Sequence, residues 1–378
     1  MTEAIAADLS HPGVLGRPGE ARPDLSGTAR LLGVGTAVPP HSYTQTELLE
    51  IFAIQDSKIR NVFTNSAIDR RFLTLPPEGP DGRRTPESQG ELLAKHKTQA
   101  VDMGVRAIEA CLADSDARAS DIAYLCCVTT TGFLTPGLSA HLIRTLGLDL
   151  HTSRLDVVGM GCNAGLNGLN AVTGWAQANP GRLAMMVCTE ACSAAYVFDG
   201  TMRTSVVNSL FGDGAAAVAV RAGDDVAPET PPGPHVMGFE SCVITEAIDA
   251  MRYDWDNEQS RFSFFLDPDV PYVVGAHAEL VVDRLLESAG LRRSDIGHWL
   301  VHSGGKKVID AVSVNLGLTR HDVRHTTGVL RDYGNLSSGS FLFSYQRLLQ
   351  ESVVRPGEYG VLMTMGPGST IETALIRW

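Results

Sequence analysis

The sequence predicts an α/β protein made of two similar halves, each a mostly parallel sheet covered by helices. Helical patterns alternate with short apolar runs at residues 124–128, 215–220 and 299–301, which is typical of such sheets. The same series of motifs also occurs twice along the 378 residues, a length that suffices for one large domain or two fused ones. We therefore expect five layers, α/β/α/β/α, with a pseudo-twofold axis and the active site where the halves meet.

The internal repeat keeps its register over several motifs. Arg-Ala-Ser-Asp-Ile at residues 118–122 corresponds to Arg-Arg-Ser-Asp-Ile at residues 292–296. We predict an N-terminal half over 28–230 and a C-terminal half over 231–378, because chance matches would not share one register. Each copy follows a helical pattern, leads to a Leu-Gly-Leu helix end, and precedes Pro-Gly and an apolar strand; the matched stretches are 103–113 and 277–288, 142–148 and 312–318, and 180–187 and 356–365.

The first residues and the cysteines indicate the setting of the protein. Residues 1–27 are rich in Gly, Pro, Ala and charge, and are predicted to form a mobile arm. They lack the basic-then-apolar pattern of a signal peptide, and no apolar run approaches the roughly 20 residues of a membrane span. The seven cysteines have no repeating spacing, so we do not expect a disulfide framework. We therefore expect the protein in the reducing cytoplasm.

Charge and ligand spacing narrow the classes of partner. The formal net charge of -12 argues against non-specific nucleic-acid binding, which needs a basic face. It does not exclude an anionic ligand, since a local cluster of Lys or Arg can bind phosphate. His321 and His325 have the spacing of zinc ligands on a helix, but no third ligand is evident, so no metal site is predicted.

Cys162 is the strongest candidate for a nucleophile. It lies in Gly-Cys-Asn-Ala-Gly at residues 161–165, after a small-residue turn and before a helical pattern. A helix N-terminus offers a positive dipole end and unpaired N–H groups, which favour the reactive thiolate. The glycines would let an acyl chain approach the backbone closely. The alternative, a small buried structural cysteine, is the interpretation for the other six.

His302 is the predicted neighbour of this sulfur. It follows the apolar run 299–301, at the carboxyl end of a strand, where α/β proteins place ligands. The two glycines at 304–305 leave the imidazole open to a cavity. There it could hold the cysteine as thiolate or donate to an enolate oxygen. The alternative is a hydrogen-bonded structural histidine.

Asn335 is the third candidate, and the repeat locates it. Cys162 lies 42 residues after Ser120, and Asn335 lies 41 residues after Ser294, so the two occupy near-equivalent places in the two halves. A pseudo-twofold axis would bring them face to face. The Asn335 amide would then be a second neutral donor to an enolate. The alternative is a turn or helix-cap asparagine.

Four motifs together make the chain resemble a type III polyketide synthase, from about residue 29 to the C-terminus. Each motif alone is weak, but the combination is specific. The resemblance implies the thiolase fold, a homodimer, and acyl groups taken directly from coenzyme A, with CoA thioesters as substrates and no cofactor. The motifs are Gly-Cys-Asn-Ala-Gly, Leu-Phe-Gly-Asp-Gly-Ala-Ala at 210–216, Gly-Asn-Leu-Ser-Ser at 334–338, and Gly-Pro-Gly-Ser-Thr-Ile-Glu-Thr at 366–373.

The resemblance also assigns roles to residues. It implies that Cys162 is acylated and extended, while His302 and Asn335 drive decarboxylation of malonyl-CoA. Neutral donors suit this step, because decarboxylation leaves negative charge on the thioester oxygen. Two gating phenylalanines and three cavity-lining positions follow by the same resemblance: Phe211, Phe264, Thr130, Cys192 and Ser337.

The basic residues depart from the family pattern. Of three that commonly hold the phosphates of coenzyme A, only Lys58 is present, because the other two positions carry Asn61 and Asn65. Two lysines after the predicted catalytic histidine are candidates for the missing charge, or else form a solvated loop. They are Lys306 and Lys307.

Residues 62–78 and 250–256 resemble a narrower group, the bacterial 3,5-dihydroxyphenylacetyl-CoA synthases of glycopeptide-antibiotic biosynthesis. That resemblance implies four malonyl-CoA units, as starter and extenders, joined by decarboxylative condensations and closed from C8 to C3. Crotonase-like auxiliary proteins are expected to help the final dehydration. Cys192 and Ala195 replace two cavity threonines of plant chalcone synthases, so an aromatic starter seated in the plant manner is not expected.

Other activities use the same residues. An initiating ketoacyl synthase, or a hydroxymethylglutaryl-type synthase, shares this fold, and the initiating enzyme would use acyl carrier protein. A thioester hydrolase would let water attack the acyl-cysteine. A catalytically dead partner subunit is disfavoured, because all three predicted catalytic residues are present.

Overall fold

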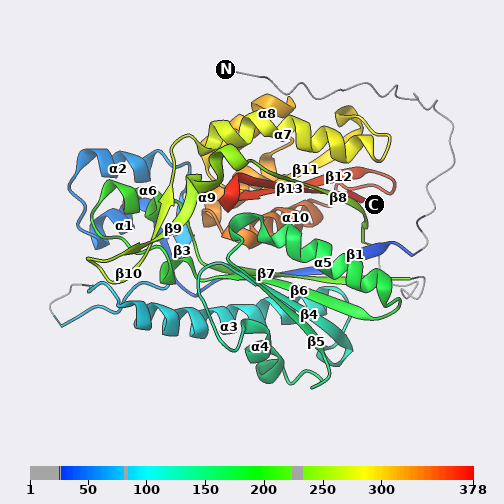
Figure 1. The fold of residues 1–378 in the computed structure, drawn as a ribbon, viewed down its shortest axis with the longest axis horizontal. Coiled ribbons are helices and arrows are strands. Elements are labelled where there is room, and N and C mark those ends of the chain that lie inside the picture. The colour runs from blue at the N-terminus through cyan, green and yellow to red at the C-terminus, as the bar shows by residue number, and fades with distance from the viewer. Residues whose placement is uncertain (1–24, 26, 81–83, 224–232) are drawn as a thin grey trace, which may run out of the picture.

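The protein is built from five layers that alternate helices and sheets (Figure 1). The computed structural model describes residues 25, 27–80, 84–223 and 233–378. The first outer layer is α3 (Gln89–Asp114) with α4 (Leu138–Leu146), and it covers a sheet of β1 (Ala29–Ala37), β7 (Gly214–Ala222), β6 (Leu183–Glu190), β4 (Ile122–Thr129) and β5 (Ser153–Val158). The central layer is α5 (Ala164–Ala178) with α10 (Ser340–Glu351). The second sheet consists of β8 (His235–Val243), β13 (Thr370–Arg377), β12 (Tyr359–Gly366) and β11 (Ile296–Val301), and the other outer layer, α7 (Val270–Glu287) with α8 (Lys306–Leu316), covers it.

The two sheets have the same pairing pattern. In the first, β6 lies between parallel β4 and antiparallel β7; in the second, β12 lies between parallel β11 and antiparallel β13. The strands form one continuous order, β11-β12-β13-β8-β1-β7-β6-β4-β5. The two sheets meet where β1 pairs with β8, and these strands share a single residue pair, Arg30 with His235. The two sheets can therefore separate into two layers. The predicted duplicated α/β fold is confirmed.

The repeated sequence motif forms the same turn in both halves. The backbone N–H of Arg118 donates to Asp121 Oδ2 at 2.9 Å, and that of Arg292 donates to Asp295 Oδ2 at 2.8 Å. Each turn leads directly into the first strand of its parallel pair, β4 or β11. The helices that follow, α4 and α8, both end at a left-handed glycine, Gly147 and Gly317.

The largest buried cluster lies around the central helix layer. α5 and α10 pack against both sheets, so they are apolar or small around most of their circumference. Two further clusters fill the spaces beneath the outer helices α3 and α7. Among the described residues, no helix is long and apolar enough to cross a membrane.

Smaller elements gather at one end of the layers, at the left of Figure 1, beside the candidate site. They surround the positions where α5 and α10 begin. The predicted arm at 1–27 and the predicted boundary at 230/231 lie almost entirely outside the described residues. The peripheral elements are β2 (Ser42–Thr44), α1 (Gln45–Ile51), α2 (Ser57–Thr64), β3 (Arg70–Phe72), α6 (Met202–Leu210), β9 (Met251–Asp256), β10 (Arg261–Leu266) and α9 (Arg324–Tyr333).

Candidate active site

The structure brings the three predicted catalytic residues to one cavity. A space of about 470 Å³ is lined by Cys162, His302 and Asn335. Cys162 comes from the N-terminal half, and the other two come from the C-terminal half. Short turns precede both helices: η2 (Gly161–Asn163), which contains Cys162, leads into α5, and η6 (Ser337–Gly339), which begins two residues after Asn335, leads into α10. The cysteine and the asparagine thus lie close to the beginnings of corresponding helices, offset by three residues. We call this space the catalytic cavity.

A tight turn holds Cys162 at the beginning of α5. Gly161 has φ of 79°, a left-handed conformation that favours glycine. A Cβ at Gly161 would lie 2.1 Å from Pro367 Cδ, and one at Gly366 would lie 2.9 Å from the Cys162 nitrogen. The Gly-Pro-Gly loop therefore packs directly on the nucleophile turn, and this close approach requires glycine at 161 and 366.

The electrostatics of Cys162 differ from the sequence-based expectation. Burial raises the pKa of the thiol to about 12, and the negative charge of Glu190 acts in the same direction. The Ser337 hydroxyl, which accepts from Sγ at 3.5 Å, acts the other way but more weakly than burial. Burial thus opposes the thiolate that the helix N-terminus is expected to favour.

His302 is also neutral in this environment. It follows β11, and its backbone N–H donates to Met363 O at 2.8 Å, which fixes its place beside β12. Burial lowers the pKa of the imidazole to about 3. Nδ1 is buried and has no hydrogen-bond partner among the described residues. The cavity therefore holds a neutral imidazole with a neutral thiol.

Asn335 is held by backbone bonds on both sides. Its N–H donates to Leu210 O at 2.8 Å, and its carbonyl accepts from Gly212 N at 3.0 Å. The side-chain oxygen Oδ1 accepts from Ser337 N at 2.8 Å. That bond orients the amide, and Nδ2 lies 3.4 Å from Gly304 O. The NH₂ group therefore lies on the same side as the loop that follows His302.

A buried carboxyl group, Glu190, was missed by the sequence analysis. Glu190 Oε2 accepts from Thr130 N at 2.9 Å, and Oε1 accepts from the hydroxyls of Ser337, at 3.3 Å, and Ser338. Burial raises the pKa of this carboxyl. Thr130 and Ser337, both predicted to line the cavity, are not among the residues that line it. They meet at Glu190 behind the nucleophile, and Ser337 links this carboxyl to Cys162. An acidic residue at the end of an otherwise apolar strand was the available signal.

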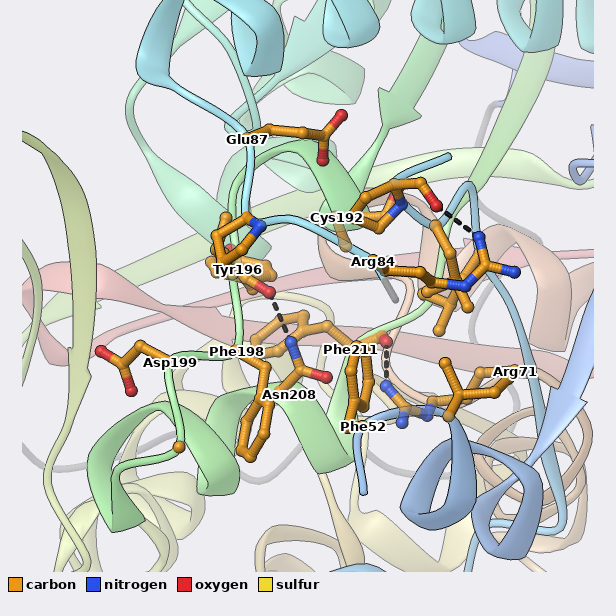
Figure 2. Close-up of a pocket in the computed structure, with 18 of the residues that line it drawn as sticks. Phe52, Arg71, Arg84, Glu87, Cys192, Tyr196, Phe198, Asp199, Asn208 and Phe211 are labelled. Carbon is orange, nitrogen blue, oxygen red and sulfur yellow. Dashed lines mark hydrogen bonds between the residues drawn. The ribbon is translucent and has the colours of Figure 1, made fainter. Parts of the chain in front are cut away.

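The predicted gating phenylalanines lie at a boundary between two cavities. Phe211 and Phe264 both line the catalytic cavity. Phe211 also lines a second cavity of about 620 Å³, together with Cys192 and Tyr196 (Figure 2). Its carbonyl accepts from Arg71 Nη1 at 2.7 Å, which anchors the backbone there. Cys192 therefore faces the second cavity, beyond the predicted gate.

The basic residues divide into two groups. Lys306 and Lys307, at the N-terminus of α8, line the catalytic cavity, and Lys306 pairs with Asp310. Lys58 is exposed in the first turn of α2 and is not among the residues that line the cavity, although Asn61 of the same helix and Asn65 at its C-cap are. Within the described part of the chain, no group of three or more His, Cys, Asp or Glu side chains is arranged to hold a metal ion.

Comparisons with known proteins agree with this geometry. The chain matches the N-terminal domain of chalcone and stilbene synthases over residues 19–224 and the C-terminal domain over 253–378. It is 71% identical to a 3,5-dihydroxyphenylacetyl-CoA synthase of Amycolatopsis orientalis, over 94% of this chain and 95% of that protein. It is 67% identical to one of Streptomyces toyocaensis, over 100% and 96%.

Solved structures show the same fold. The 1,3,6,8-tetrahydroxynaphthalene synthase of Streptomyces coelicolor, a bacterial type III polyketide synthase, superposes with a TM-score of 0.81 at 29% identity, over 92% of this chain and 99% of that one. PKS-I of the brown alga Ectocarpus siliculosus superposes with a TM-score of 0.85 at 24% identity, over 93% and 98%. The second likeness concerns the fold alone.

Proposed function

The chain belongs to the chalcone and stilbene synthase family of type III polyketide synthases, and from that premise we propose that it condenses four malonyl-CoA molecules into 3,5-dihydroxyphenylacetyl-CoA. One observation carries the choice of product. Three relatives bearing that activity are 67–71% identical to this chain over at least 94% of its length. The shared cavity of Cys162, His302 and Asn335 supports the same chemistry.

The first step loads a malonyl group onto Cys162. The neutral thiol gives its proton to the neutral imidazole of His302 as Sγ attacks the thioester carbon. The new carbon–sulfur bond forms, the bond to the sulfur of coenzyme A breaks, and the departing thiolate takes up a proton. A neutral pair leaves no charge buried before substrate arrives.

The second step forms the carbon–carbon bond. An extender malonyl-CoA loses CO₂, and the electron pair of the broken bond moves to the thioester oxygen as an enolate. Donors from the His302 imidazole and the Asn335 amide stabilise that oxygen, and the enolate carbon attacks the acyl group on Cys162. The bond between that acyl carbon and Sγ breaks, the thiolate of Cys162 takes up a proton, and the extended chain is left on coenzyme A. Transfer of this chain back to Cys162, with release of coenzyme A, begins the next round. The Asn335 amide suits this role because Ser337 N donates to its Oδ1 and so orients the group, while Nδ2 gives one hydrogen to Gly304 O and has a second one for the enolate.

The carbon count agrees with the proposed product. Three condensations on a malonyl starter give a tetraketide of nine carbons, of which eight remain in the product once the carboxylate of the starter leaves as CO₂. Joining C8 to the C3 carbonyl and losing water leaves a six-membered ring with oxygens on C5 and C7. C1 and C2 remain as the acetyl thioester, which is the 3,5-dihydroxyphenylacetyl pattern. A carboxylate retained on the starter would make C8 a good carbon nucleophile.

Coenzyme A would enter past the N-terminus of α8. Lys307 lines the catalytic cavity and forms no ion pair with any residue that the structure describes, whereas Lys306 pairs with Asp310. A free ammonium beside a helix N-terminus suits a phosphate group. Lys307 is thus our first candidate for holding a phosphate of coenzyme A, with Lys306 as the second and the exposed Lys58 as the third.

Assembly and location are part of the proposal. The edge strand β5 and the neighbouring exposed side chains Phe133 and Met160 suit a contact with a second copy of the chain. We propose a homodimer that works in the cytoplasm. The crotonase-like auxiliary proteins stay a prediction from the family resemblance.

Mass spectrometry of the products formed from malonyl-CoA alone tests the function. We expect 3,5-dihydroxyphenylacetyl-CoA without acyl carrier protein, and a covalent malonyl or polyketide adduct on Cys162. Cys162→Ala should lose the adduct, while Cys242→Ala, a half-buried cysteine outside both cavities, should keep it. A product of another chain length would refute the specific assignment. Free malonate alone would favour a hydrolase, and a need for carrier protein would favour an initiating ketoacyl synthase.

A further inference from the structure

Four aromatic side chains form a wall beside the catalytic cavity. Tyr196, Phe211, Tyr253 and Phe264, here called the aromatic partition, have ring centroids 4.3 Å apart for Tyr196 and Phe211, and 5.2 Å apart for Tyr253 and Phe264. Phe211 and Phe264 line the catalytic cavity, while Tyr196 and Phe211 line the second cavity (Figure 2). The partition therefore stands between the two spaces.

The register of the β9–β10 hairpin places Tyr253 on the cavity side. Tyr253 is directly opposite Phe264, and Met251 is directly opposite Leu266. Alternate residues of a strand share a face, so these four side chains lie on one side of the hairpin. The other three all line the catalytic cavity. Tyr253 shares their face of the hairpin and packs against Phe264, although it is not itself among the residues that line either cavity.

The phenol of Tyr253 is a buried group without a partner. Its Oη is shielded from solvent and has no hydrogen bond among the described residues. Tyr196 is close enough to lower its pKa by hydrogen bonding, but no bond of normal geometry joins the two hydroxyls. Leaving such a group unpaired is unfavourable, because burial removes its hydrogen bonds to water. An unpaired buried group therefore calls for an explanation, and a ligand that completes the bond provides one.

The surroundings of the hydroxyl indicate what it would bind. Burial raises the pKa of Tyr253, because a phenolate would be poorly solvated there. The phenol therefore stays protonated at neutral pH and acts as a donor. Its natural partner beside an acylated Cys162 is a carbonyl oxygen, and a poly-β-ketone chain carries one on every second carbon.

We propose that the Tyr253 hydroxyl is a substrate-positioning group that donates a hydrogen bond to a ketone oxygen of the polyketide bound to Cys162, and so holds the chain in the conformation that closes its ring. This inference rests on the proposed function, because the phenol can restrict the conformation of the bound chain only if that chain carries several ketones. A linear triketone can also close through oxygen to a lactone. Holding one ketone restricts which atoms meet.

Tyr253→Phe tests the hydroxyl alone, because the ring and its packing remain. Removing an unpartnered buried hydroxyl should leave the urea midpoint unchanged or raise it. Acylation of Cys162 and release of CO₂ from malonyl-CoA should stay within about twofold of wild type. The ratio of aromatic product to lactones and linear acids should fall at least fivefold, as measured by chromatography with mass detection.

Tyr345→Phe is the matched control. Tyr345 is a buried phenol in α10 that lines neither cavity. Its variant should keep the wild-type product ratio. If Tyr253→Phe also keeps that ratio, the positioning role is refuted. If wild type itself makes another product, the proposed function fails, and the ratio of cyclised to linear products in the two variants still decides the role of the phenol.

Discussion

At Cys162 and His302, burial decides the charge state. The thiol has a pKa raised to about 12 and the imidazole a pKa lowered to about 3, and loss of solvation is the largest cause of both shifts. Burial thus favours the neutral form of both groups over an ion pair, and in the proposed mechanism the imidazole accepts the thiol proton when a thioester enters. The identity of both residues could be predicted from motif and spacing. Their charge state could not, because it depends on groups such as Glu190 that come from distant parts of the chain.

Asn335 offers a sharp test of the enolate step. In Asn335→Asp, the Oδ1 acceptor for Ser337 N is retained, but a carboxylate replaces the donor and opposes the developing negative charge. Loss of one such donor typically costs about 10²–10³ in rate. We expect release of CO₂ from malonyl-CoA to slow by at least 100-fold, and to be slower than in Asn335→Ala.

Loading separates this effect from misfolding. The amount of adduct on Cys162, measured by intact mass, should remain near that of wild type. Asn315→Asp, on the exposed side of α8, makes the same chemical change away from the cavity and should leave both rates unaltered. A decarboxylation rate for Asn335→Asp equal to that of wild type would remove the residue from the mechanism.

Among the elements, the nucleophile turn depends on a loop from the other half. A Cβ on Gly366 would lie 2.3 Å from Asn163 Oδ1 and 2.9 Å from the Cys162 nitrogen. Gly366→Ala must therefore displace the turn or the loop, at a cost of about 1–3 kcal/mol in the free energy of unfolding. Because the displaced atoms carry the nucleophile, we expect the rate of Cys162 acylation to fall at least tenfold.

Gly174→Ala is the control for that substitution. Gly174 lies inside α5, where a Cβ would meet nothing within 4 Å. Alanine there should raise the free energy of unfolding by up to about 1 kcal/mol and leave acylation unchanged. Urea unfolding and the time course of the mass adduct measure both effects. Wild-type acylation by Gly366→Ala would show that the loop does not position the sulfur.

Element prediction succeeded where the chain repeats itself. The Arg-x-Ser-Asp-Ile motif predicts two equivalent turns, because the Asp side chain accepts a hydrogen bond from a backbone N–H in each. The hairpin β9–β10 was not predicted, and with it Tyr253 was missed. Its inward face is defined by contacts with α6 and the cavity wall, and those partners are distant in sequence. Patterns of residue type alone do not reveal such contacts.

For the whole molecule, buried thiols and phenols predict a loss of stability at alkaline pH. Burial raises the pKa of six cysteines above the ordinary value of 9.0, and of Tyr196, Tyr253 and Tyr345 above theirs of 10.0. Above pH 9 the unfolded chain releases these protons while the folded protein keeps them. Folding is then coupled to proton uptake, so the free energy of unfolding must fall as pH rises.

The size of the slope can be bounded. Each thiol that stays protonated contributes up to about 1.4 kcal/mol per pH unit above 9. Urea midpoints under reducing conditions should therefore fall between pH 8 and pH 10. Cys127→Ala should reduce the slope even if it lowers stability at pH 7, because one titrating group of the unfolded chain is removed. A urea midpoint independent of pH over this range would contradict the prediction that the buried thiols and phenols stay protonated in the folded protein.

The assembly prediction rests on one edge of the molecule. β5 is the last strand of the sheet order, and Thr129 of β4 pairs with Val158 at its end, so the segment with Phe133 follows beside it. Phe133 is 72% exposed and Val158 is 42% exposed, and a monomer would leave both in water next to unpaired strand groups. A second copy can cover this edge through a self-complementary contact.

We expect a solution mass of about twice 40.4 kDa by sedimentation. Phe133→Glu should weaken the dimer at least tenfold, whereas Val314→Glu, at an 80% exposed position on α8, should not. A monomeric wild type would contradict the dimer. Equal dissociation constants for the two variants would show that the interface lies elsewhere on the molecule.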